Sequence, residues 1–431
     1  LWESLTVLPS YPLELRPSML EHLRLDRARK LISLFGEPVI FHCHHYNLFL
    51  QQTIEDPDWI DGVSILRTAA QEIFYSLLQG AFKTLGVQQA AERLAVACQL
   101  FGFLGLGRLE LQASPSGGEA QLTHSHYAEG WLSKYGDQAN RTRPIDHLAV
   151  GYVAAALDAT FGELGSYTAE ETECMAVTRK DRCLIQATRL PRPQTLVPSP
   201  GMGKLIECPA DLPKPITAVD YDAVNEALWS LPLAGDERGQ IRAFNVLLTR
   251  MPANYYNRIQ YRFLEELKAV QPGLQQVAED LIRESGHVCV FYTLGNIMES
   301  LEWETLVGPM LEKDTDWIHG AYAVASSLGF GRWQALEVVS NHSCRVAIDG
   351  NYETNYFLAS YPRADYPSCY FAQGAVPALM NLVYNGNIQQ KPILDQVFYN
   401  RLFQRGGLFY GKETKAREKG DPWCEFYAER I

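Results

Sequence analysis

Two parts of the chain carry the same short motifs in the same order, and this internal duplication limits the possible folds more than any other feature. Asp56–Gly62 recurs as Asp314–Gly320, and Leu104–Leu109 recurs as Leu328–Trp333. In both copies a β-type run precedes the first motif. A strand pair, an aromatic cluster and a Gly-containing helical run follow the second. A repeated order of landmarks indicates a repeated structural unit. We therefore expect two related modules in tandem, packed with pseudo-twofold symmetry.

The repeat also predicts which residues are equivalent. Trp59 should superpose on Trp317 because each lies in the first motif of its copy. Cys183 should superpose on Cys424 because each copy ends on an acidic residue, a gap and a cysteine. If these pairs fall in unrelated elements, the motifs do not mark a duplication.

The division of the chain follows from the limits of the two copies. We expect an N-terminal helical arm over residues 1–36 and a first module over residues 37–190. Residues 191–285 are interpreted as a Pro-rich boundary and a helical linker, since apolar residues recur there at helical spacing. Residues 286–431 are the second, degenerate module. The predicted fold is α+β, and each module is a small, mainly antiparallel sheet covered by helices.

Composition excludes several classes of protein. The chain has 431 residues, of which 47% are hydrophobic, and a net charge of −12 with no basic stripe. We therefore expect neither a nucleic-acid nor a membrane partner. Nine cysteines at irregular intervals argue against a disulfide framework and favour reduced thiols in the cytoplasm. The initial Leu1 suggests excision from a longer polypeptide, and a homodimer is the other partner considered.

The end of the second copy, Glu413–Phe426, resembles the closing motif of the 4-vinyl reductase-type, or hydrocarbon-binding, domain. That resemblance implies a mixed α/β fold with a hydrophobic pocket, and zinc held by a set of Cys and Glu residues. In the second copy Ala416 stands where the first copy has Cys174. Cys369, Glu413 and Cys424 then form only a three-ligand remnant.

In the first copy the corresponding residues are Glu171, Cys174 and Cys183, with Asp146 or His147 as a possible fourth ligand. Two cysteines nine residues apart around a turn can reach one tetrahedral centre. The alternative is that both are ordinary buried thiols.

Histidines form a second candidate metal site in the first copy. Phe41–Tyr46 holds three His and one Cys, and on a strand His42 and His44 would share a face. His124 and His126 have the same spacing, and the second copy lacks both pairs. We expect the two pairs to converge on iron or zinc. The alternative is that these are surface or turn histidines.

These observations favour a metalloenzyme of the non-haem iron or zinc type. Its substrate would be a small apolar or aromatic molecule bound near Tyr127 and Trp131 in the first module. The cofactor would be a divalent transition metal. The alternatives are a ligand-binding or sensor module whose metal is purely structural, and a scaffold domain of a larger protein.

Overall fold

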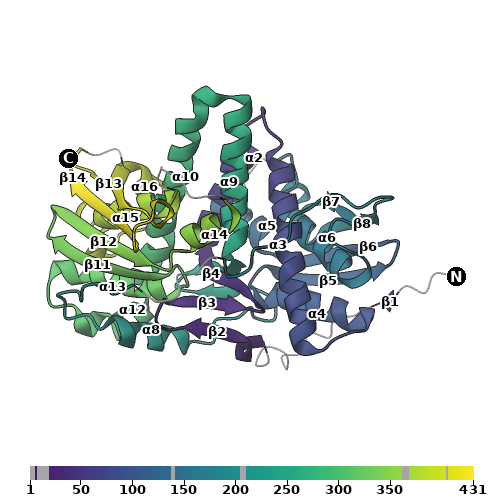
Figure 1. Cartoon of the computed structure of the whole chain (residues 1–431), viewed down its shortest axis with the longest axis horizontal. Helices are drawn as coiled ribbons and strands as arrows, with labels where there is room; N and C mark the ends of the chain where they lie inside the picture. The colour runs from purple at the N-terminus through teal and green to yellow at the C-terminus, as the bar shows by residue number, and fades with distance from the viewer. Residues whose placement is uncertain (1–4, 7–18, 137–140, 204–209, 362–367, 404–405) are drawn as a thin grey trace.

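The computed structural model describes residues 5–6, 19–136, 141–203, 210–361, 368–403 and 406–431. Helices cover three antiparallel sheets, one at each side of the molecule and one between them (Figure 1). The predicted α+β fold of repeated modules is therefore confirmed. No helix in the described ranges is both long enough and apolar enough to cross a membrane. The eight cysteines among these residues are free thiols, as predicted, and Cys208 lies outside them.

The first repeat runs from the central sheet to the sheet at one side of the molecule. Its last four strands form an antiparallel sheet in the order β5-β6-β8-β7, and β1 (Leu5–Thr6) adds to the β5 edge. Its elements are β4 (Glu37–Cys43), α2 (His44–Glu55), α3 (Gly62–Leu85), α4 (Ala90–Phe103), β5 (Gly107–Ser114), β6 (Gly117–Ser125), α5 (His126–Tyr135), α6 (His147–Phe161), β7 (Tyr167–Glu173), α7 (Met175–Thr178) and β8 (Cys183–Arg189).

The second repeat follows the same plan, and its last four strands have the equivalent order β11-β12-β14-β13. A π-helical turn, Val290–Leu294, continues α10, and other short turns separate some elements. Its elements are β10 (Val246–Pro252), α9 (Ala253–Val270), α10 (Gln275–Cys289), α11 (Gly295–Met298), α12 (Leu301–Leu306), α13 (Asp314–Ser327), β11 (Arg332–Val339), β12 (Ser343–Asp349), α14 (Tyr352–Ser360), α15 (Tyr370–Met380), α16 (Gln396–Phe403), β13 (Phe409–Lys415) and β14 (Cys424–Arg430).

The second repeat begins earlier than the sequence analysis placed it. β10 and α9 open the second repeat in the same way that β4 and α2 open the first. The next long helix, α10, packs on α15, and this contact is the equivalent of the contact between α3 and α6 in the first repeat. The range 191–285, expected to be a boundary and linker, therefore includes the start of the second module. Only the part up to α8 (Tyr221–Trp229) and β9 (Ile241–Ala243) connects the repeats. Helical periodicity identified α9 and α10 as helices, but periodicity does not say which core a helix joins.

The central sheet joins the repeats. Its order is β2 (Leu23–Asp26), β3 (Leu31–Leu34), β4, β10, β9, all antiparallel. The described residues before β4 thus contain a strand hairpin, so the predicted helical arm over 1–36 is wrong in this part. β2 and β3 are two four-residue runs joined by a turn, which is too short a pattern to distinguish from a helix by periodicity.

The pairing of β4 with β10 defines a pseudo-twofold axis. Phe41 pairs with Arg250, and these two residues occupy equivalent places in their repeats. Each also donates a backbone hydrogen bond across to the other repeat: Phe41 to the carbonyl of Leu328 at 3.0 Å, and Arg250 to that of Leu104 at 2.8 Å. Because the two contacts are reciprocal, the repeats are packed as two halves of a symmetric pair, as predicted.

The two Trp residues are not equivalent, which corrects one expectation. Trp59 is 46% exposed in the segment before α3, whereas Trp317 lies inside α13, the counterpart of α4. The shared motif does not reflect one shared role, because the acidic residues that cap the two helices stand at different positions in it: Asp61 aligns with His319, and Asp316 aligns with Asp58. Asp61 accepts from the backbone of Ser64, and Asp316 caps α13. Cys183 and Cys424 do correspond, because each begins the last strand of its repeat.

Candidate functional site

Glu171, Cys174 and Cys183 come together beside the β7–β8 hairpin. Glu171 lies on β7, Cys174 immediately precedes α7, and Cys183 begins β8. One ligand atom of each lies within 4.8 Å of the other two, and all three residues are buried. The structure thus assembles the set that the sequence grouped. That a metal binds there stays a prediction.

Asp146 completes the surroundings of this set. It precedes α6, and its backbone N–H donates to Oε2 of Glu171 at 2.8 Å. Its carboxyl group accepts a hydrogen bond from Ser125 and interacts with the Cys183 thiol. Oδ2 of Asp146 and Oε1 of Glu171 are buried without a hydrogen-bond partner. Asp146 therefore lies beside the set of three without joining it at the same spacing, and we name Asp146, Glu171, Cys174 and Cys183 site 1.

The acidic groups of site 1 perturb one another strongly. Burial, reinforced by the charge of Asp146, raises the pKa of Glu171 to about 10. A hydrogen bond with Cys183 lowers the pKa of the Cys174 thiol to about 7 and raises that of Cys183. Without a cation, the cluster has to hold protons, since several negative charges at such spacing repel one another.

The second repeat contains a matching cluster with four members. Cys369 precedes α15, Glu413 lies on β13, Glu418 lies in the turn before β14, and Cys424 begins β14. One ligand atom from each lies within 4.8 Å of the others. We name these four residues site 2. The expected three-ligand remnant is thus corrected, because Glu418 supplies a fourth donor.

Site 2 is surrounded by polar groups that orient its ligands. Sγ of Cys369 and Cys424 are 3.7 Å apart, and the Thr354 hydroxyl lies 3.0 and 3.2 Å from them. The backbone N–H and the hydroxyl of Ser368 both donate to Oε1 of Glu418 at 2.7 Å. Burial, with the nearby Cys424, raises the pKa of Glu413 to about 10, and its Oε1 has no hydrogen-bond partner.

The two sites contain the same donors in different positions. Asp146 corresponds to Cys369, because each precedes the equivalent helix, so a carboxylate in one repeat stands where the other has a thiol. The opposite exchange occurs in the closing hairpin, where Cys174 is replaced by Ala416 and Glu418 lies two residues further on. Each repeat therefore retains two thiols and two carboxyl groups in this region, although the second carboxyl group joins the cluster in site 2 and lies beside it in site 1. A position-by-position comparison of the two copies missed Glu418, because this carboxylate does not align with Cys174 but lies two residues beyond Ala416.

His42 does not belong to either cluster. It lies on β4, stacks on Tyr46 at 3.7 Å between ring centroids, and packs edge-on against Tyr256 and Phe330. Its Nδ1 is 3.3 Å from Sγ of Cys289 in the second repeat. Burial lowers the pKa of His42 well below its ordinary value. This imidazole is a neutral part of the aromatic core between the repeats.

The other predicted histidines do not form a four-imidazole cluster, although one from each pair lies close to the other. β4 ends at Cys43, so His44 starts α2 and does not share a strand face with His42. His44 lies near His126, with ring centroids 6.5 Å apart, while His124 is bound to Glu129 at 2.7 Å. Asn47 contacts Nε2 of His126 at 2.9 Å. No cluster of three or more ligand atoms among the described residues includes a histidine.

The aromatic residues proposed for a substrate pocket are packed in place. Tyr127 is buried on α5, and Trp131 contacts Tyr135 at 4.3 Å between centroids. Arg141 lies 4.8 Å above the Trp131 ring. His147, the alternative fourth ligand of site 1, points toward Glu55, with Nε2 3.5 Å from its carboxylate.

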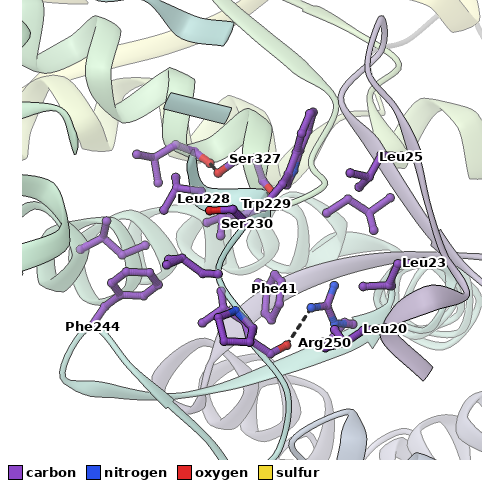
Figure 2. A pocket seen from close by; sticks show the side chains of 17 residues that line it. Leu20, Leu23, Leu25, Phe41, Leu228, Trp229, Ser230, Phe244, Arg250 and Ser327 are labelled. Atoms are coloured by element: carbon purple, nitrogen blue, oxygen red, sulfur yellow. Dashed lines mark hydrogen bonds between the residues drawn. The ribbon is translucent and has the colours of Figure 1, made fainter. Parts of the chain in front are cut away.

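A cavity of about 270 Å³ lies on the central sheet, next to the pseudo-twofold axis. Its walls are leucines of β2, the segment after α8, and the end of α13, and Phe41 and Arg250 form its floor (Figure 2). Neither Tyr127 nor Trp131 lines it. Arg250 is the cavity's single charged residue, and it is only 4% exposed. The sequence carried one signal for it, an arginine within the otherwise apolar and polar-uncharged strand Val246–Pro252.

Comparison with known proteins gives little further information. The sequence matches no known protein family, and no curated protein matches it. Among solved structures, the phenol-responsive sensory domain of the transcription activator PoxR, with phenol, is similar at a TM-score of 0.36 and 14% sequence identity. The alignment covers 42% of this chain and 92% of that chain. A similarity at this level assigns neither a family nor a ligand.

Proposed function

We propose that this chain is a small-molecule-binding protein in which each repeat is held together by a divalent metal ion, zinc, bound at sites 1 and 2. The observation that carries the metal assignment is that equivalent places in the two repeats gather two thiols with carboxyl groups, Glu413 and Glu418 in site 2 and Glu171 in site 1, where Asp146 lies beside the cluster. The position of a thiol and of a carboxylate differs between the repeats, yet the donor types are the same.

The main alternative is that these are ordinary buried thiols beside acidic residues. Buried carboxyl groups normally have hydrogen-bond partners, and an ionised one without compensation is costly. Glu171 in site 1 and Glu413 in site 2 each leave Oε1 unpartnered. The same defect at equivalent places in both repeats supports a shared missing partner, and a divalent cation meets that need at both sites.

The donor types favour zinc over iron. Thiolate sulfur combined with carboxylate oxygen in a set of four suits tetrahedral zinc. Site 2 already contains four donors, of which three are buried, and site 1 contains three buried donors with the Asp146 carboxyl beside them. A set of four protein donors is the pattern of a structural site and not of a catalytic one with an open position. The resemblance of Glu413–Phe426 to the hydrocarbon-binding domain, which implies zinc on a Cys and Glu set, supports the same assignment.

The location explains what each metal would do for the fold. In site 1 the clustered donors come from β7, from the residue before α7 and from β8, with Asp146 at the start of α6 beside them. Site 2 uses the start of α15, β13, the turn before β14, and β14. A metal there would attach a core helix to the closing hairpin of its sheet. The metalloenzyme hypothesis required an imidazole from each histidine pair to share a metal. His42 and His124 are engaged elsewhere, and although His44 lies near His126, no cluster of three or more ligand atoms among the described residues includes them.

Zinc analysis of purified protein and of matched variants tests this proposal. Wild-type protein is expected to hold two zinc ions per chain, while Cys183→Ser and Cys424→Ser each retain one. Cys98→Ser is the control, because Cys98 is a buried thiol on α4 outside both sites. A wild-type chain without stoichiometric zinc, or variants that retain two, would refute the assignment.

A further inference from the structure

Arg250 carries a buried charge that the protein leaves without a counter-ion. Its Nη2 donates to the carbonyl of Leu233 at 2.8 Å, and its guanidinium lies 4.4 Å from the centre of the Phe41 ring (Figure 2). Nε is buried without a hydrogen-bond partner. Among the described residues no carboxylate forms an ion pair with it.

An unpaired guanidinium in such a place is costly. Removing an ion from water requires a partner of opposite charge or several hydrogen bonds, and Arg250 has one hydrogen bond and two aromatic contacts. Burial lowers the pKa of Arg250 to about 9, so the group remains charged at neutral pH. By contrast, the buried Arg258 on α9 is paired with Glu72 at 2.7 Å. The chain therefore pairs a buried arginine elsewhere and leaves this one open to the cavity.

The side chains that line the cavity indicate the polarity and size of the part of the ligand that does not contact Arg250. Beyond Arg250 they are leucine, isoleucine, valine and aromatic side chains, with Ser230 and Ser327 among the few polar ones. A volume of about 270 Å³ lies near the lower end of the ~300–1,000 Å³ range of small-molecule sites. That volume accommodates a molecule with a short apolar body and a single polar end.

We propose that the cavity binds a medium-chain or aryl-alkyl monocarboxylate, with the carboxylate on Arg250 and the apolar body against the leucines of β2 and the segment after α8. This inference rests on the proposed small-molecule-binding function and names the ligand class. One guanidinium matches one carboxylate, since its N–H groups can donate in parallel to both oxygens. A phosphate dianion would require more than the single cation present.

The pseudo-symmetry indicates one such site per chain. The residue equivalent to Arg250 across the axis is Phe41, and it pairs with Arg250 in the sheet. The first repeat thus has the uncharged Phe41 ring at the position where the second repeat has the Arg250 guanidinium. The ligand site is accordingly asymmetric, in contrast to the two metal sites.

Calorimetric titration of the zinc-loaded chain with octanoate, with 1-octanol as the uncharged probe of the same length, tests the proposal. Octanoate is expected to bind once per chain and at least about tenfold more tightly than 1-octanol, because a hydrogen bond to a charged group is worth that factor or more. Arg250→Met should weaken octanoate binding by about 10- to 100-fold and leave 1-octanol binding unchanged.

Two further variants complete the experiment. Arg242→Met is the matched control, because Arg242 is an exposed residue of the neighbouring strand β9 that does not line the cavity, and its octanoate affinity should equal that of wild type. Leu25→Phe narrows the cavity and should weaken both probes. The proposal is wrong if wild type fails to bind octanoate at roughly millimolar concentration, or does not prefer it to 1-octanol. Zinc content, measured on the same samples, shows separately whether the metal sites are intact.

Discussion

Substitution of the glycine at the crossing between the repeats should destabilise the protein far more than substitution of a comparable glycine elsewhere. Gly329 has φ of +94° and follows Leu328, whose carbonyl accepts from Phe41 of the other repeat. A Cβ atom on Gly329 would lie 2.5 Å from the carbonyl oxygen of Val39. Gly36 has nearly the same φ, +93°, but a Cβ there meets nothing within 4 Å.

Comparing alanine at these two glycines distinguishes the cost of a left-handed backbone conformation from the cost of a steric clash of the added Cβ atom. The left-handed conformation costs an alanine about 1–2 kcal/mol, and this applies at both glycines. At Gly329 the β4 backbone would also have to move, and such overpacking adds about 1–3 kcal/mol. We therefore expect a loss of ~1–2 kcal/mol for Gly36→Ala and ~2–5 kcal/mol for Gly329→Ala.

Urea unfolding, followed by tryptophan fluorescence and far-ultraviolet circular dichroism, measures the difference. Gly105→Ala should behave like Gly329→Ala, since its Cβ would lie 2.7 Å from the Leu248 carbonyl oxygen across the axis. If Gly329→Ala and Gly105→Ala are no less stable than Gly36→Ala, the reciprocal contact between the repeats does not exist as described.

Two other predictions concern buried charges. Burial raises the pKa of Glu37 in the folded protein to about 7, above its ordinary 4.5. Because the folded protein then binds this proton more tightly than the unfolded chain does, the free energy of unfolding falls as the pH rises from about 4.5 to above 7. The free energy of unfolding of Glu37→Gln, measured by urea unfolding, should therefore be about 2–3 kcal/mol higher than that of wild type at pH 8 and equal to it at pH 5. An equal gain in unfolding free energy at both pH values would contradict the raised pKa of Glu37. Arg258→Met should cost about 1.5–3 kcal/mol, because Glu72 of the other repeat then keeps only the partly exposed Arg262 as a cationic partner, at 2.9 Å, and adding Glu72→Met should recover part of that loss in the same assay.

The fold class was predictable because it depends on local patterns, and the duplication was predictable from the Gly-x-Gly-Arg and closing motifs, whereas the Trp59 and Trp317 motifs match in sequence without being equivalent in the fold. The closing cysteines, Cys183 and Cys424, were matched correctly since each follows a turn and begins a strand. The grouping of Glu171 with Cys174 and Cys183 succeeded for the same reason, because one hairpin holds all three.

The errors came from contacts between distant parts of the chain. β4 looked like the first strand of a module sheet, but its partner β10 is about two hundred residues away, and no local signal announces such a pairing. Because Cys43 ends the strand and His44 starts α2, the alternation that would align the histidines stops between them. The cavity at Arg250 depends on the same long-range pairing, so the residue was not recognised as a candidate.

X-ray absorption at the zinc edge on the wild-type chain tests the central claim most directly, because it reports the donors around the metal itself. Site 2 offers two sulfur and two oxygen donors, and site 1 offers two sulfur donors and Glu171, with the Asp146 carboxyl beside them as the second oxygen donor that we propose. The expected spectrum therefore has an average first shell of two sulfur atoms at about 2.3 Å and two oxygen atoms at about 2.0–2.2 Å, with two zinc ions per chain. A shell of imidazole nitrogen without sulfur, or a chain that binds no zinc, would contradict the account.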